Sequence, residues 1–180
     1  MEHNYCATCG NVWLRPLMEE DIEKLRQWRN DKRNSEYLSP HEHITKEKQE
    51  EWYRAYQEND DEITFAICIK ENEDQIVGSL SLYNFKEDSA EFGKFLIGEK
   101  SAHGKSVGHN AVLAALYVAF ISIGLKKISL FVFSNNTSAL TCYKHAGFIT
   151  DNEYIKETSV SSEFLMTISD DQYRKENQNA

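Results

Sequence analysis

The sequence contains little proline and little glycine, with two prolines and eight glycines in 180 residues. This scarcity excludes collagen-like and low-complexity segments, which need one or both residues in quantity. Four cysteines are too few for a disulfide scaffold. Cys6 and Cys9 form one CxxC pair, without the second pair that a zinc ribbon requires. We therefore expect no metal site, and ordinary thiols such as those of the reducing cytoplasm.

Long apolar runs are also missing. The most apolar segment, Ala111 to Leu125, has 15 residues, whereas a membrane span needs about 20. The first residues, MEHNYCATCGN, lack the apolar stretch of a secretory signal. Positive charge is scarce too, because 20 Lys and Arg stand against 29 Asp and Glu and give a net charge of −9. We expect a cytoplasmic protein that binds neither membranes nor nucleic acid, whose phosphates demand basic side chains; a cationic partner remains compatible with this charge.

Hydrophobic periodicity divides the chain into helices and strands. The expected helices are 19–32, 45–57 with Thr45 as N-cap, 107–123 and 136–146; the expected strands are 12–15, 63–69, 76–83, 90–97, 128–133, 148–155 and 163–168. The order lacks the regular βα repetition of a Rossmann fold or barrel. It predicts one α/β (α+β) domain with a mixed sheet over residues 12–169, preceded by a mobile N-terminal arm (1–11) and followed by a polar C-terminal tail (170–180).

Two of the expected strands carry additional information. Gly93 lies inside strand 90–97, where a glycine often marks a bulge or a close backbone approach. Strand 128–133 is nearly all apolar, which favours burial on both faces.

The polar loop from His103 to Gly108 precedes the apolar helix. A helix N-terminus offers free N–H groups and the positive end of a dipole, and glycines let the backbone approach a ligand. With the charge of Lys105, the loop predicts a site for phosphate or pyrophosphate; a plain connection without a ligand is the alternative. It is not a P-loop, because Glu99 occupies the position of the first glycine.

Residues 136–148, NTSALTCYKHAGF, carry a motif that resembles that of a known family. They resemble the N-x-x-A-x-x-x-Y-x-x-x-G-F signature of the GNAT acyl-CoA N-acyltransferases, in which a [QR]-x-x-G-x-[GA] loop before a long apolar helix holds the pyrophosphate of coenzyme A. Loop 103–108 occupies that place, and the resemblance extends over about 12–168. It implies a GNAT-like mixed, mostly antiparallel sheet of six to seven strands flanked by about four helices.

Weaker motifs indicate a branch of the family. AEFGKFL at 90–96 resembles the AEIGYWL strand of the RimJ/RimL-like branch. WRN at 28–30 and the I-T-x-E-x-Q-x-x-W run at 44–52 resemble sugar-amine acetyltransferases of the pseudaminic-acid pathway type. Three residues depart from these patterns: His103 replaces Gln or Arg, Ser106 replaces the central glycine of the loop, and Lys94 replaces an aromatic residue.

The resemblance implies direct transfer of an acetyl group from acetyl-CoA, as co-substrate, to a primary amine. Tyr143 matches the tyrosine that protonates the leaving thiolate, and Glu91 is the candidate base for the amine. An amide near Gly93 could polarise the thioester carbonyl. The expected cofactor-binding residues are Phe95, Leu96, Ile97, His103, Gly104, Lys105, Ser106, Val107, Gly108 and Asn136. Trp28, Arg29 and Tyr83 are expected to line the acceptor pocket.

Several alternatives stay open at this stage. Tyr143 could only pack against the cofactor, Asn136 could cap a helix, and Trp28 could belong to the core. Cys142 precedes Tyr143, but no basic neighbour activates it as a nucleophile. The acceptor could be a nucleotide-linked amino sugar, a protein N-terminus or a polyamine. A non-catalytic acyl-CoA-binding module and an unrelated phosphate-binding protein are the competing functions, and the chain could be a monomer or a homodimer.

Overall fold

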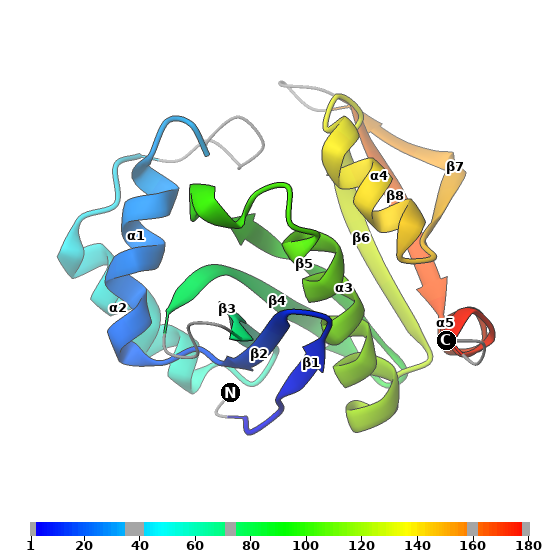
Figure 1. Cartoon of the computed structure of the whole chain (residues 1–180), viewed down its shortest axis with the longest axis horizontal. Coiled ribbons are helices and arrows are strands. Elements are labelled where there is room, and N and C mark those ends of the chain that lie inside the picture. The colour runs from blue at the N-terminus through cyan, green and yellow to red at the C-terminus, as the bar shows by residue number, and fades with distance from the viewer. Residues whose placement is uncertain (1–2, 35–41, 71–74, 158–161, 178–180) are drawn as a thin grey trace.

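A single sheet with helices on both faces organises the chain in the computed structural model, which describes residues 3–34, 42–70, 75–157 and 162–177 (Figure 1). The strands are β1 (Ala7–Cys9), β2 (Val12–Pro16), β3 (Glu62–Ile69), β4 (Ile76–Lys86), β5 (Ser89–Ile97), β6 (Lys127–Phe133), β7 (Ile149–Glu157) and β8 (Ser162–Ser169). The helices are α1 (Ile22–Asn30), α2 (Lys46–Glu58), α3 (Val107–Tyr117), α4 (Thr137–His145) and α5 (Asp170–Asn177). Short 3-10 turns cover Glu19–Asp21 and Lys100–Ala102, and a π-helical segment, Val118–Ile123, continues α3.

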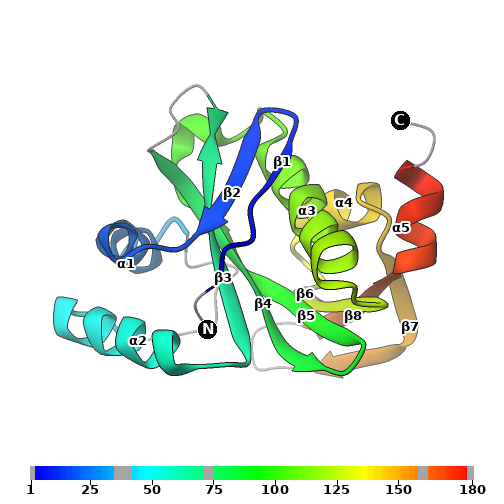
Figure 2. The ribbon, with the colours of Figure 1, turned by 90° about the horizontal axis from the view of Figure 1, so that it is seen from below.

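The eight strands lie in the order β1-β2-β3-β4-β5-β6-β8-β7. Neighbours are antiparallel except β5 and β6, which are parallel. Figure 2 shows α1 and α2 on one face of the sheet and α3, α4 and α5 on the other. The predicted mixed, mostly antiparallel fold is confirmed, with one strand more than expected.

Each face of the sheet has its own hydrophobic core. Alternate residues of a strand point to opposite faces, so Ile63, Phe65 and Ile67 pack towards α3, whereas Ala66 and Cys68 pack towards α1 and α2. The α1–α2 core is rich in aromatic rings, with Trp28, Tyr53 and Tyr56 buried in it. The central strands are therefore covered on both faces.

Strand β5 changes course halfway along its length. Its pairing with β4 shifts by one residue between Ser79–Leu96 and Ser81–Gly93, so β5 has a bulge there, as Gly93 predicts. Lys94 adopts a left-handed conformation with φ 49°. On its other edge, β5 pairs with β6 only at Ser89, Ala90 and Glu91. The two strands therefore part after Glu91, and the sheet opens between them.

The N-terminal residues correct one prediction. Residues 1–11 were expected to form a mobile arm, but Ala7–Cys9 is strand β1, paired with β2, and Ala7 is buried. The ring of His3 is buried as well: its Nε2 lies 3.1 Å from the Thr64 carbonyl oxygen. Burial lowers the pKa of His3, an effect that the bond to Thr64 partly opposes. A three-residue strand carries too little periodicity to be recognised, and the partner strand is what fixes it.

The C-terminal residues correct another. The stretch expected as a polar tail forms helix α5, and Tyr173 is buried against the ring of Phe120, 5.3 Å between centroids.

Strand β6 also differs from expectation, because its residues alternate between buried and accessible and Phe131 is 40% exposed. Among the described helices, those that cover β6 lie on one of its faces. No helix among the described residues is long and apolar enough to cross a membrane.

Candidate active site

The opening beside β5 brings the predicted cofactor strand to an accessible edge. Leu96 and Ile97 pair with Ser79 and Gly78 of β4, while among the described strands none pairs with their other edge. Their backbone groups on that side can bind an extended ligand as an added strand would. The Phe95 ring lies near Tyr143, 6.5 Å between centroids, so the strand, α4 and the opening meet here.

The loop between β5 and α3 lies at the end of this edge. His103, Gly104, Lys105 and Ser106 are exposed, whereas the Val107 side chain is buried, so only its backbone is accessible to a ligand. The N–H of Asn110 bonds to the Ser106 carbonyl, and the amides before it precede the first helical hydrogen bond. His103, which stands where Gln or Arg is usual, places its Nε2 3.0 Å from the Ile97 carbonyl oxygen and ties the loop to β5.

Ser106 has a backbone conformation that the sequence could not indicate. It adopts φ 58° at the N-cap of α3, a left-handed conformation that costs a non-glycine residue roughly 1–2 kcal/mol. Glycine occupies this position in the loop that the segment resembles. The chain therefore keeps the glycine-like backbone, and the amides it presents, despite the side chain.

We predict that Ser106→Gly stabilises the protein. Relief of the left-handed strain outweighs the entropy that glycine gains in the unfolded chain, and the expected gain in unfolding free energy is about 0.5–1 kcal/mol. Ser101→Gly, in the neighbouring 3-10 turn, is the matched control and should destabilise. Urea denaturation measures both; a loss of stability in Ser106→Gly would contradict the strain.

Tyr143 occupies a buried position at the opening. Its side chain is 7% exposed and packs against the rings of Phe92 and Phe148, with centroids 5.8 Å away in both cases. Among the described residues no group hydrogen bonds to its hydroxyl. Burial, followed by the Cys142 and Tyr83 side chains, raises the pKa of Tyr143 above its usual range. The phenol therefore stays protonated at neutral pH and is available as a proton donor.

Glu91 and Tyr83 lie on the opposite face of β5 from Tyr143. They are register partners on β5 and β4. The Glu91 carboxylate accepts a hydrogen bond of 3.1 Å from Asn84 Nδ2. Burial first, and then Glu91, raises the pKa of Tyr83 to about 12. The base candidate and the acid candidate thus lie on different faces of β5.

The two remaining acceptor candidates differ in their surroundings. Trp28 is 7% exposed and packs so closely on Gly98 that a Cβ there would lie 2.1 Å from the indole ring. Trp28 is therefore a core residue, which was the alternative to lining the acceptor pocket. Arg29 makes no ion pair within the described residues, and burial lowers the pKa of its guanidinium. Contact with an acceptor stays a prediction for Arg29 and Tyr83.

Asn136 and Cys142 complete the α4 motif. Asn136 caps α4, because its Oδ1 accepts a hydrogen bond of 3.1 Å from the Ala139 amide. Its contact with a pantetheine arm stays a prediction. Burial raises the pKa of Cys142 to about 11, which makes the reactive thiolate scarce. Among the described residues no group of three or more His, Cys, Asp or Glu side chains could hold a metal ion.

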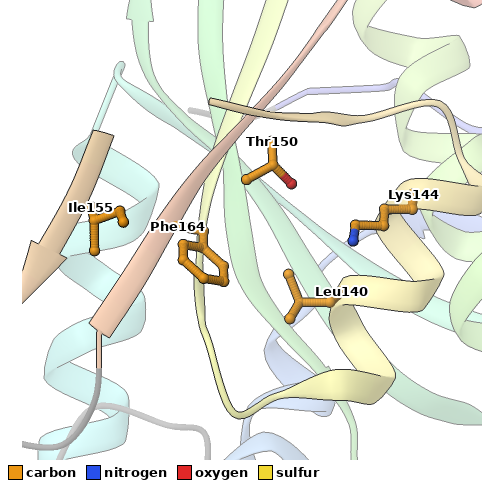
Figure 3. Close-up of a pocket in the computed structure, with 5 residues that line it drawn as sticks. All are labelled: Leu140, Lys144, Thr150, Ile155 and Phe164. Atoms are coloured by element: carbon orange, nitrogen blue, oxygen red, sulfur yellow. The ribbon is translucent and has the colours of Figure 1, made fainter. Parts of the chain in front are cut away.

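A cavity of about 210 Å³ lies on α4 but outside this site (Figure 3). It lies between α4 and the β7–β8 pair and is lined by Leu140, Lys144, Thr150, Ile155 and Phe164. None of the predicted site residues lines it. This cavity therefore does not mark the predicted site.

Glu62 has no place in the sequence prediction, and Lys94 enters it only because it replaces an aromatic residue. The Glu62 side chain is 7% exposed, and its Oε2 accepts from Lys94 Nζ at 2.5 Å. Lys94 in turn lies over the Tyr83 ring, 5.2 Å from its centroid. A charged residue in the otherwise apolar start of β3 is a signal that could have drawn attention to Glu62. The partnership with Lys94 could not be read, since 32 residues separate the two.

The fold brings together the loop before α3, the open edge of β5 and the buried Tyr143 side chain. In a comparison with known proteins, the profile of the family described as "Acetyltransferase (GNAT) domain" matches residues 11–149. The chain belongs to the GNAT acetyltransferase family, and it is an acetyl-CoA-dependent N-acetyltransferase.

Three similar proteins illustrate the range of the family. Alpha/beta-tubulin-N-acetyltransferase 9 of Drosophila melanogaster is 26% identical over 151 residues, which cover 77% of this chain and 75% of that protein. Spermidine N-acetyltransferase of Vibrio cholerae, solved with CoA and spermine, has a TM-score of 0.80 at 23% identity and covers 91% of this chain and 98% of its own. Apo FdhC, a nucleotide-linked sugar GNAT, has a TM-score of 0.81 at 17% identity, with 98% and 97% covered.

Proposed function

We propose that acetyl-CoA binds from the α3–α4 side, with its pyrophosphate at loop 103–108 and its pantetheine arm along Phe95, Leu96 and Ile97. A primary amine approaches from the face that carries Glu91 and attacks the thioester directly. The observation that carries this proposal is the buried side chain of Tyr143. Its hydroxyl has no hydrogen-bond partner among the described residues, and its ring packs near Phe92 and Phe95 of β5, the strand that parts from β6.

The proposed chemistry divides between two side chains. Glu91 takes a proton from the acceptor ammonium, and the neutral amine attacks the acetyl carbon. An amide of the β5 bulge polarises the thioester carbonyl as charge develops on its oxygen. Tyr143 gives its proton to the departing thiolate, so that coenzyme A leaves as the thiol, and the tyrosinate recovers a proton from the nitrogen that has bonded to the acetyl carbon. The scarcity of thiolate at Cys142 favours this direct route over an acetyl-cysteine intermediate.

For the acceptor we propose a nucleotide-linked amino sugar. The partly buried guanidinium of Arg29 supports this, because it has no acidic partner among the described residues and a phosphate would supply one. The likeness of fold to a nucleotide-linked sugar GNAT and the WRN motif at 28–30 agree with it. The RimJ/RimL-like branch is part of the same proposal.

A polyamine is the second candidate, favoured by a different observation. Burial is the largest cause of the raised pKa of Tyr83. The carboxylates of Glu91, Glu62 and Glu163 contribute to the same rise. Negative charge on this face suits a cationic acceptor, and the likeness to a spermidine acetyltransferase agrees with it. A protein N-terminus is supported only by the similarity to a tubulin acetyltransferase. A cytoplasmic location completes the proposal, supported by the absence of disulfides between the four cysteines.

Release of the CoA thiol tests the proposal across matched acceptors. Acetyl-CoA is offered with nucleoside-diphosphate amino sugars, their unphosphorylated amino sugars, spermidine and an N-terminal peptide. We expect the highest kcat/KM with a nucleotide-linked sugar, and a loss of about tenfold or more for that substrate in Arg29→Met, since a charged hydrogen bond contributes about 1.5–3 kcal/mol. Preference for spermidine, with no effect of Arg29→Met, would favour the second candidate; no thiol release with any amine would overturn the proposed activity.

A further inference from the structure

The bulge of β5 is tied to a residue two strands away. Lys94 stands at the bulge, and its ammonium contacts the Glu62 carboxylate on β3, so the ion pair passes across β4. Glu62 is buried, and its other oxygen accepts a hydrogen bond of 3.0 Å from Thr64 Oγ1. Thr64 Oγ1 is also 2.8 Å from Ser81 Oγ on β4. The carboxylate that holds Lys94 is therefore itself held by Thr64 of its own strand, and Thr64 is linked in turn to Ser81 of β4.

The same ion pair holds Tyr83 in place. The Lys94 ammonium lies over the phenol ring. On the other side, a Cβ at Gly93 would lie 2.8 Å from the Tyr83 hydroxyl oxygen, which shows how closely that hydroxyl approaches the bulge. Glu91, the register partner of Tyr83, in turn helps to raise the pKa of the phenol. Bulge, phenol and carboxylate thus form one connected group on the acceptor face.

We propose that Lys94, through its ion pair with Glu62, is a positioning residue that fixes the β5 bulge and Tyr83 for catalysis. The inference rests on the proposed function, in which the bulge amides face the thioester carbonyl. Lys94 stays in a left-handed conformation that lysine rarely adopts, and a partner for its side chain explains why that conformation persists. The ion pair acts on the reaction and not on cofactor binding, because Leu96 and Ile97 have regained their own register with β4.

Substitutions at the pair test this role by separating kcat from KM. In Lys94→Met and in Glu62→Gln, kcat should fall about tenfold, the order expected from a small misplacement of catalytic groups, while KM for acetyl-CoA changes less than twofold. The double variant should be no slower than either single one, because both remove the same contact. Lys94→Arg should recover most of the rate. Lys86→Met, an exposed lysine at the end of β4, is the matched control with unchanged rate.

Lys94→Gly distinguishes positioning from simple backbone strain. Glycine adopts the left-handed conformation freely, so the bulge can form without the ion pair. We expect Lys94→Gly to lose as much kcat as Lys94→Met. Wild-type kcat in Lys94→Gly, or effects of Lys94→Met and Glu62→Gln that multiply in the double variant, would overturn the proposal.

Amide hydrogen exchange gives a readout that does not depend on the reaction. Exchange over residues 92–96 should be faster in Lys94→Met than in the wild type and unchanged in Lys86→Met. If exchange over residues 92–96 is the same in Lys94→Met as in the wild type, the positioning role is overturned, even where the wild-type protein transfers acetyl groups. Faster exchange in a protein without acetyl transfer would instead refute the proposed function and leave the structural tie demonstrated. Far-UV circular dichroism confirms that each variant is folded.

Discussion

Tyr143→Phe should slow acetyl transfer by roughly 10²–10⁴, the range associated with general acid–base catalysis. The substitution keeps the ring, which packs against Phe92 and Phe148, and removes only the proton donor. The fold should be unaffected, because no hydrogen bond to the hydroxyl is lost among the described residues. Affinity for coenzyme A should barely change, since the lost interaction acts in the transition state. Steady-state kinetics with an acceptor for which chemistry is rate-limiting measures the effect.

The matched control is Tyr117→Phe, at the exposed end of α3, 47% exposed and outside the site. It should react at the wild-type rate. If Tyr143 only packs against the cofactor, its phenylalanine variant should behave in the same way as this control. A folded Tyr143→Phe enzyme with near-normal kcat would therefore remove the general-acid assignment and leave the remainder of the site intact.

Gly108→Pro should weaken coenzyme A binding by about 10- to 100-fold, the equivalent of one charge-assisted hydrogen bond of roughly 1.5–3 kcal/mol. The Gly108 amide lies in the first turn of α3, before the first helical bond from Asn110, so proline removes a donor for the pyrophosphate without breaking the helix. Isothermal titration with coenzyme A gives the dissociation constant, and the melting temperature reports on the fold.

Gly108→Ala keeps the amide and tests the steric effect alone. A Cβ there meets Phe95 at 3.6 Å, an ordinary contact, so binding should stay within about threefold of the wild type. Lys105→Ala should cost less than Gly108→Pro, because an exposed charge adds little in water. Normal binding by a folded Gly108→Pro variant would show that the loop does not hold the pyrophosphate.

The sequence predicted the local elements of the site well, because their signals are local. Helix α2 begins at Thr45, whose side chain accepts from the Lys48 amide as an N-cap should. The apolar helix ends at Gly124, which adopts φ 87°. Asn136 caps α4, and Gly93 lies at the bulge. In each case one residue type has a conformational preference strong enough to act without tertiary contacts.

By itself, the sequence predicted the helices and strands between residues 12 and 168 and the position of loop 103–108 directly before α3. The tertiary structure alone decided the rest. Strand β1 and helix α5 exist because partners cover them, and β6 is exposed on one face because none of the described helices covers it. The contact of Glu62 with Lys94 joins strands distant in the chain. These features depend on which surfaces come together in the fold. The free energy gained by burying a side chain or pairing two charges exists only once distant segments are in contact.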